Sequence, residues 1–179
     1  MTISRSVWMR ALIVPLGAIC MFLGGGAEAA PNPRDPNKLE RLTSPEGGFT
    51  VVMPCGVGQA TTNTVTTAKG LVTEHTFHYS TGSEQYEVGY ADFHDTADVG
   101  LESIRKFLAS KNKILTSADI TKNGHRGETI TLIADDGKYV GATIFSVGSR
   151  VVFASYSSAD PAGLQVHGAA FLESLQLTR

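Results

Sequence analysis

Two short turn signals in the C-terminal half constrain the fold more than any other feature of the sequence. Asp136-Gly137 and Gly148-Ser149 each separate two largely apolar runs, and both dipeptides favour the primed turns of two-residue hairpin loops. The runs at 127–135, 138–147 and 150–158 are therefore predicted to be three consecutive antiparallel strands.

The strand register follows by counting if both loops hold two residues. Leu132 then lies opposite Gly141 and Gly141 lies opposite Tyr156, while Ile144 lies opposite Phe153 on the other face. Both faces of the middle strand are largely apolar, so we expect both faces of the sheet to be covered. Gly141 leaves a gap in its row, which either a helix side chain or an apolar ligand would fill.

Further strands are predicted before and after a helix in the sequence. Alternating patterns at 49–53, 62–67, 71–79, 85–93 and 113–121 indicate strands. A helix from Asp98 to about Lys111 would place Leu101, Ile104 and Leu108 on the sheet, with Glu102 and Lys106 paired on its outer face.

A second helix is predicted to start at Asp160, with Pro161 as its first residue. Its apolar side carries Leu164, Phe171, Leu172 and Leu175. Gly168 weakens this helix, unless a small residue is needed there because the helix crosses close to the sheet. The chain is thus expected to be an α+β protein, an α/β/α sandwich with a central, mainly antiparallel sheet.

The N-terminal region has the features of a secretory signal peptide at 1–29, with Arg5 and Arg10 before an apolar run at 11–23. This run would make only ~20 Å of helix, which is short for a membrane anchor. Lipid modification at Cys20 is a weaker alternative. Cleavage before Ala30 would leave a Pro-rich linker at 30–41, a domain at 42–179 and a secreted or periplasmic protein without a membrane span.

Charge and cysteine content exclude several classes of protein. The formal net charge is −2 and the basic residues are scattered, which argues against nucleic-acid binding. Only Cys55 would survive cleavage, so no intrachain disulfide is expected. The exported domain is expected to be a monomer. A disulfide between two copies stays open if the Cys55 thiol is exposed.

The best candidate for a metal site is the cluster of Asp92, His94 and Asp95 at the end of a predicted strand. Asp92 and His94 project the same way, and Asp95 begins the loop, which gives three nitrogen or oxygen donors. The alternative is that both aspartates bond backbone groups of the turn. His75 and His78 are three apart on a strand and therefore point to opposite faces.

No catalytic residue or cofactor is predicted. Cys55 has no basic residue or histidine near it in the sequence, and the pattern Gly-x-Ser-x-Gly is absent. His125 and His167 have no partner close in sequence. Tyr79, Tyr86 and Tyr90 fit either an aromatic contact surface or the core.

The order of several short motifs resembles the PsbP-like domains of exported bacterial proteins. These motifs are SPEGGFTVVMP at 44–54, YEVGYAD at 86–92, GHRGE at 124–128, YV at 139–140, VGSRVV at 147–152 and FLESL at 171–175. The resemblance implies an α/β/α sandwich that is shared by the extrinsic PsbP subunit of photosystem II and by a Ran-binding nuclear import factor. These two have unrelated partners, so the fold implies no activity.

The expected function is that of an exported, non-enzymatic binding or accessory domain that acts on a protein or another envelope component. The expected binding surface is a sheet edge or the loops near the first hairpin. A metal-binding module at Asp92, His94 and Asp95 is the alternative, and a hydrolase that uses a serine or Cys55 comes third.

Overall fold

The computed structural model describes residues 39–54, 60–67, 70–93 and 101–178. The predicted signal peptide, Cys55, His94, Asp95 and Asp98 lie outside the described residues. Within them, all strand pairs are antiparallel and form two sheets.

The larger sheet has seven strands in the order β3-β4-β5-β9-β8-β7-β6. Its strands are β3 Ala60–Thr67, β4 Gly70–Ser80, β5 Glu84–Phe93, β6 Lys113–Lys122, β7 His125–Ile133, β8 Tyr139–Val147 and β9 Arg150–Ser158. The mainly antiparallel sheet expected from the alternating patterns is therefore confirmed, and β3 and β6 are its outer strands.

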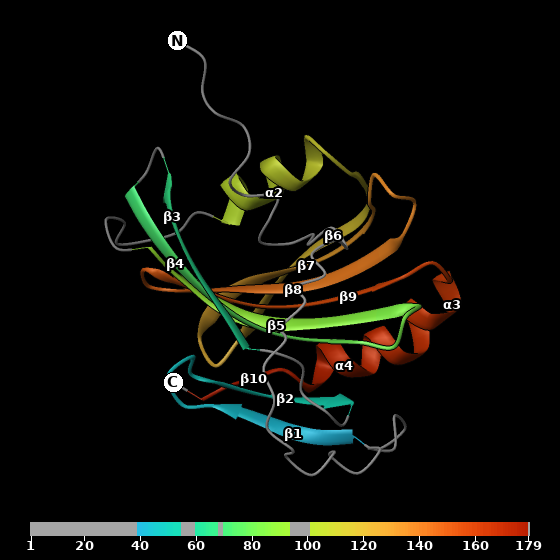
Figure 1. Ribbon diagram of the computed structural model, residues 1–179. Helices are drawn as coiled ribbons and strands as arrows, with labels where there is room; N and C mark the ends of the chain where they lie inside the picture. The colour runs from blue at the N-terminus through green and yellow to red at the C-terminus, as the bar shows by residue number, and fades with distance from the viewer. Residues whose placement is uncertain (1–38, 55–59, 68–69, 94–100, 179) are drawn as a thin grey trace, which may run out of the picture.

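Helix α2 (Leu101–Ala109) covers one face of this sheet, as Figure 1 shows. Leu108 is buried, and Leu101 and Ile104 pack against a core that includes Ile130, Ile144 and Phe153, as the spacing predicted. On the outer face Lys106 and Glu102 form the expected ion pair, with 2.9 Å between Nζ and Oε1.

The C-terminal helix and a second, three-stranded sheet cover the other face (Figure 1). The helix is divided into α3 (Pro161–Gly163), a π-helical turn η1 (Leu164–Gly168) and α4 (Ala169–Ser174). The small sheet has the order β1-β2-β10. Its strands are β1 Leu39–Ser44, β2 Phe49–Pro54 and β10 Gln176–Leu177.

Helix and sheet share this second face, so the expected α/β/α sandwich describes the arrangement only loosely. The sequence patterns had not predicted β1 or β10. β1 begins at Leu39, which lies within the segment 30–41 that was expected to be a linker, and β2 is the predicted strand at 49–53.

The start of the C-terminal helix agrees with the sequence prediction. Asp160 caps it, since its Oδ1 accepts a hydrogen bond of 2.9 Å from the amide of Ala162, and Pro161 follows. Phe171 and Leu175 are buried, and Leu164 and Leu172 pack beside them. The π-helical turn in the middle was not predicted.

The predicted register between β8 and β9 is confirmed, because Gly141 lies opposite Tyr156 and Ile144 lies opposite Phe153. The predicted register between β7 and β8 is wrong by one residue: Leu132 lies opposite Val140, and Thr131 lies opposite Gly141. The loop holds three residues, 135–137, because Ala134 and Lys138 close it through a hydrogen bond of 2.9 Å.

This shift moves Leu132 and Ile130 to the opposite face from the one predicted, where they join the core beneath α2. The gap at Gly141 is filled by helix side chains, the first of the two alternatives. A Cβ atom there would lie 2.7 Å from Cδ1 of Leu164 and 3.0 Å from Cδ1 of Leu172. Gly168 is needed for close crossing, since a Cβ would lie 2.6 Å from Cδ1 of Tyr156.

Candidate functional site

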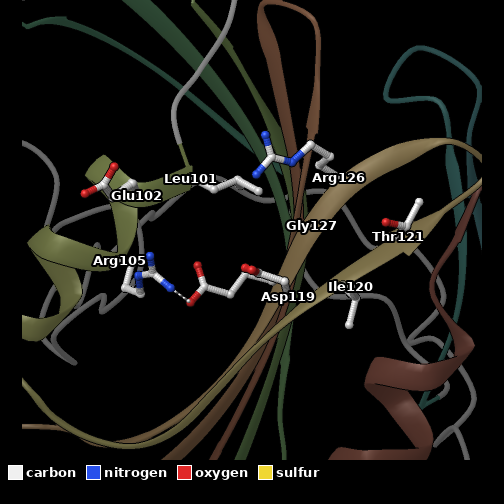
Figure 2. A pocket seen from close by; sticks show the side chains of 9 residues that line it. Leu101, Glu102, Arg105, Asp119, Ile120, Thr121, Arg126 and Gly127 are labelled. Atoms are coloured by element: carbon white, nitrogen blue, oxygen red, sulfur yellow. Dashed lines mark hydrogen bonds and ion pairs between the residues drawn. The ribbon is translucent and has the colours of Figure 1, made fainter.

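The described residues form a polar pocket between helix α2 and the ends of strands β6 and β7. Its volume is about 330 Å³, within the range of small-ligand sites. Figure 2 shows Leu101 and Arg105 reaching from the helix towards Asp119 and Arg126 on the strands. The lining consists of Leu101, Glu102, Arg105, Asp119, Ile120, Thr121, Arg126, Gly127 and Glu128.

The strand register places the charged groups of the pocket on one face. Asp119 lies opposite Glu128 and Thr121 lies opposite Arg126, so all four side chains point to the α2 side. Between Arg126 and Glu128, Gly127 faces the other way and lies so close to Phe145 that a Cβ would be 2.5 Å from its ring. This close packing fixes where Arg126 and Glu128 stand.

Glu128 is the buried acidic residue of the pocket, and its carboxylate has an ion pair and a hydrogen bond within the protein. Its side chain is 3% exposed, Nη1 of Arg105 lies 3.4 Å from its Oε1, and the hydroxyl of Ser117 donates to the same oxygen. A buried carboxylate that already has two donors stabilises the wall of the pocket and is not available to bind a ligand.

Asp119 and Arg126 differ from Glu128, because both are exposed and neither has an ion pair in the described part of the chain. The pocket thus offers one unpaired anion and one unpaired cation beside the outer strand β6. None of the lining residues is a histidine or a cysteine. Such a surface is suited to binding charged groups of a partner.

A second polar cluster surrounds Glu84, where β5 begins. Its Oε1 accepts hydrogen bonds from the hydroxyl of Tyr156 at 2.6 Å and lies 2.7 Å from Nδ1 of His167, and its Oε2 accepts from Tyr86 at 3.0 Å. Burial raises the pKa of Glu84, but the hydrogen bonds from Tyr156, His167 and Tyr86 outweigh it and lower the pKa overall.

The π-helical turn holds the imidazole of His167 in this cluster, with the side chain 58% exposed. His167 has no partner close in sequence, because Glu84 stands 83 residues earlier in the chain. The only local signals were Gly163, which precedes the turn, and Gly168, which is its last residue. A Cβ at Gly163 would lie 2.7 Å from the hydroxyl of Tyr156.

The structure describes one of the three predicted metal ligands, Asp92. Its two carboxylate oxygens accept a forked pair of hydrogen bonds from Arg150, from Nε at 2.6 Å and from Nη2 at 2.8 Å. Among the described residues there is no group of three or more His, Cys, Asp or Glu that could hold a metal ion. His94 and Asp95 are outside those residues, so the metal site stays a prediction.

The other predicted residues have mainly structural surroundings. His75 stacks on Tyr90 with 4.6 Å between ring centroids, and His78 lies opposite Glu87 on the other face, as the spacing predicted. Tyr86 and Tyr90 are buried, so they belong to the hydrophobic core and not to an aromatic contact surface. Cys55 lies outside the described residues, and its role stays a prediction too.

The fold of this chain is PsbP-like. The solution structure of cyanobacterial PsbP (CyanoP) from Synechocystis sp. PCC 6803 is similar to this chain, with a TM-score of 0.51 and 13% sequence identity. The similarity covers 85% of this chain and 99% of that protein. At this identity the likeness concerns the fold alone.

No protein-family model matches the sequence, and no curated protein matches it. In the described part of the chain, no helix combines the length and the apolar character needed to cross a membrane.

Proposed function

We propose that this protein is an exported, non-enzymatic binding domain, and that it binds a protein or another envelope component through the pocket between α2 and β7. The observation that carries the proposal is the pair of exposed charges at Asp119 and Arg126, neither of which forms an ion pair with another described residue. Charged side chains at a rim guide association and select partners. The signal-like segment 1–29 supports export.

The polar chemistry of the pocket supports binding rather than catalysis. Ser117 donates its hydroxyl proton to the carboxylate of Glu128, which Arg105 also engages. A serine nucleophile needs a general base that can accept its proton and pass it on, usually a histidine. The residues that line the pocket include no histidine, and the carboxylate next to Ser117 is already paired with Arg105.

The pocket can be tested by crosslinking in intact cells that express the full-length protein. Arg126→Glu reverses the charge of an exposed residue that has no ion pair among the described residues, and we expect it to reduce crosslinks to a specific partner by about tenfold. The matched control is Arg41→Glu, the same charge reversal at an exposed residue of β1. Cell fractionation of the same samples tests export.

Equal crosslinking of the wild type and the Arg126→Glu variant would show that the pocket is not the binding surface. A purified domain that converts a substrate would contradict the non-enzymatic part of the proposal.

A further inference from the structure

Strand β3 is one of the two outer strands of the large sheet, and its outer side has no strand partner among the described residues. Its pairing with β4 runs from Ala60 to Thr67 without a shift in register. An outer strand in an antiparallel ladder presents about half of its backbone N–H and C=O groups outward, where another strand can pair with them.

The opposite outer strand, β6, carries several features that prevent such pairing. Lys113 and Lys122 stand at its ends, Asp119 lies along it, and its ladder is interrupted between Ile114 and Thr116. Lysines, other charged side chains and bulges are the usual protection of sheet edges. The sheet therefore has one protected edge at β6.

Strand β3 has none of this protection. Its sequence, ATTNTVTT, contains no charged residue and no proline, and threonine and valine favour strands. Ala60, Thr62, Asn63 and Thr64 are exposed. A regular, uncharged and exposed outer strand is the arrangement that pairs most readily with a further strand.

We propose that β3 pairs antiparallel with β3 of a second copy of this chain, so that the two large sheets become one continuous sheet. When two identical strands pair across a two-fold axis, any charged side chain near the axis faces the same charge in the other copy. β3 has no charged residue, so two copies of it can pair without this repulsion. This inference is independent of the proposed function, because the pocket lies beside β6 and β7, at the other end of the strand order.

Symmetry restricts the register of this pairing. Residues directly opposite in an antiparallel pair share a face, and a two-fold axis normal to the sheet keeps each residue on its face. One residue must therefore lie opposite its own copy, with the axis midway between the two, and this residue is Asn63 or Thr64 at the centre of the strand. With Asn63 opposite its own copy, Thr62 of each copy lies opposite Thr64 of the other.

Threonine pairs of this kind already join β3 to β4 within one copy. The hydroxyl oxygens of Thr61 and Thr76 are 2.5 Å apart, and those of Thr64 and Thr73 are 3.4 Å apart. Cross-strand threonine pairs stabilise a sheet by roughly 0.2–1 kcal/mol each. The same contacts can form on the outer side of β3.

The first test is sedimentation of the purified protein over a range of concentrations, where we expect a monomer–dimer equilibrium. The double variant Thr62→Lys/Thr64→Lys places like charges across the axis and is expected to raise the dissociation constant by about tenfold or more. Thr116→Lys, at an exposed position of β6, is the matched control and should leave the constant unchanged. Thermal unfolding confirms that each variant is folded.

The second test locates the axis by disulfide trapping in a Cys55→Ser background. Asn63→Cys or Thr64→Cys, whichever lies opposite its own copy, should give a covalent dimer on mild oxidation, because opposite Cα atoms lie ~4.5–5.5 Å apart. Thr116→Cys is the control. A wild-type monomer at every concentration, or a dimer that the lysine pair does not weaken, would overturn the proposal.

Discussion

The carboxylate of Glu84 shows how much a single side chain can organise. Two tyrosine hydroxyls and one imidazole, from β5, β9 and the π-helical turn, converge on its two oxygens. An ionised carboxylate with several donors is a strong hydrogen-bond acceptor, and it keeps the phenols protonated: burial and then Glu84 itself raise the pKa of Tyr86 and of Tyr156. The cluster therefore fixes the C-terminal helix to the sheet.

Gly168 gives a test of this contact at a single residue. Gly168→Ala should destabilise the protein by about 1–3 kcal/mol, because the new methyl group would overlap the ring of Tyr156. Helix propensity alone predicts the opposite sign, a gain of roughly 0.5–1 kcal/mol. Urea unfolding measures the difference, and a more stable Gly168→Ala variant would contradict the close crossing.

A control for propensity is available two residues away. Ala170 is exposed on α4, so Ala170→Gly should lose only the propensity contribution of roughly 0.5–1 kcal/mol. The two substitutions change the same pair of residue types in opposite directions, and we expect both to destabilise.

At the level of elements, the hairpins show what local sequence can and cannot predict. Gly148-Ser149 gave the correct register because the loop holds two residues, and the pair Val147 and Arg150 closes it. Asp136-Gly137 gave a register wrong by one residue. Gly137 has a φ of 83°, and a third loop residue, Asp135, precedes the pair. An Asp-Gly dipeptide fits a hairpin loop of two residues and a loop of three residues. Only the packing of the strands against the rest of the protein decides between the two lengths.

The same limit applies to the candidate site. The helix face of α2 and the strands β6 and β7 follow from hydrophobic periodicity, but the pocket depends on which residues of distant elements meet. Arg126 and Glu128 belong to the motif GHRGE that carried the family resemblance, yet no local pattern indicates that Arg105 reaches Glu128. β1 and β10 were missed because they are short or largely polar and pair only through β2.

Arg150 connects two elements that are distant in sequence, the large sheet and the β1–β2 turn. Its guanidinium is forked onto Asp92, lies 4.4 Å from the centroid of the Tyr90 ring and donates to the carbonyl of Glu46. A lysine keeps the charge but cannot make the fork and the third bond together.

Arg150→Lys should therefore loosen the β1–β2 hairpin while the large sheet stays folded. We expect faster amide hydrogen exchange at 44–52, by about tenfold, with little change in β7 and β8. Arg126→Lys is the matched control, since Arg126 has no ion pair in the described chain. Unchanged exchange at 44–52 in the Arg150→Lys variant would show that the hairpin is held by its apolar contacts alone.

At the scale of the whole molecule, two carboxyl groups on the α2 side of the sheet link stability to pH. Burial raises the pKa of Glu74 to about 7. Burial also raises the pKa of Glu87 to about 8, with repulsion from Glu74 as a smaller cause and a hydrogen bond with Ser155 acting against it. The register places Glu74 opposite Ala91 and Glu87 opposite Ser155, so both face the same side.

The direction of the pH dependence follows from these shifts. In the unfolded chain both groups lose their protons near the ordinary glutamate pKa of 4.5, whereas in the folded chain they keep them until about pH 7 and about pH 8. Between these limits the folded state binds more protons, so the free energy of unfolding falls as the pH rises. The total change is on the order of a few kcal/mol.

Urea unfolding at pH 5 and at pH 8.5 measures this effect, and we expect the wild type to be less stable at the higher pH. Glu74→Gln/Glu87→Gln replaces two titrating groups by neutral ones of similar shape, so its stability should change less between the two pH values. Glu173→Gln, at an exposed residue of α4, is the control and should behave as the wild type does. A wild-type protein that gains as much stability towards pH 8.5 as the double variant does would contradict the raised pKa values of Glu74 and Glu87, because raised values require stability to fall as the two carboxyls ionise.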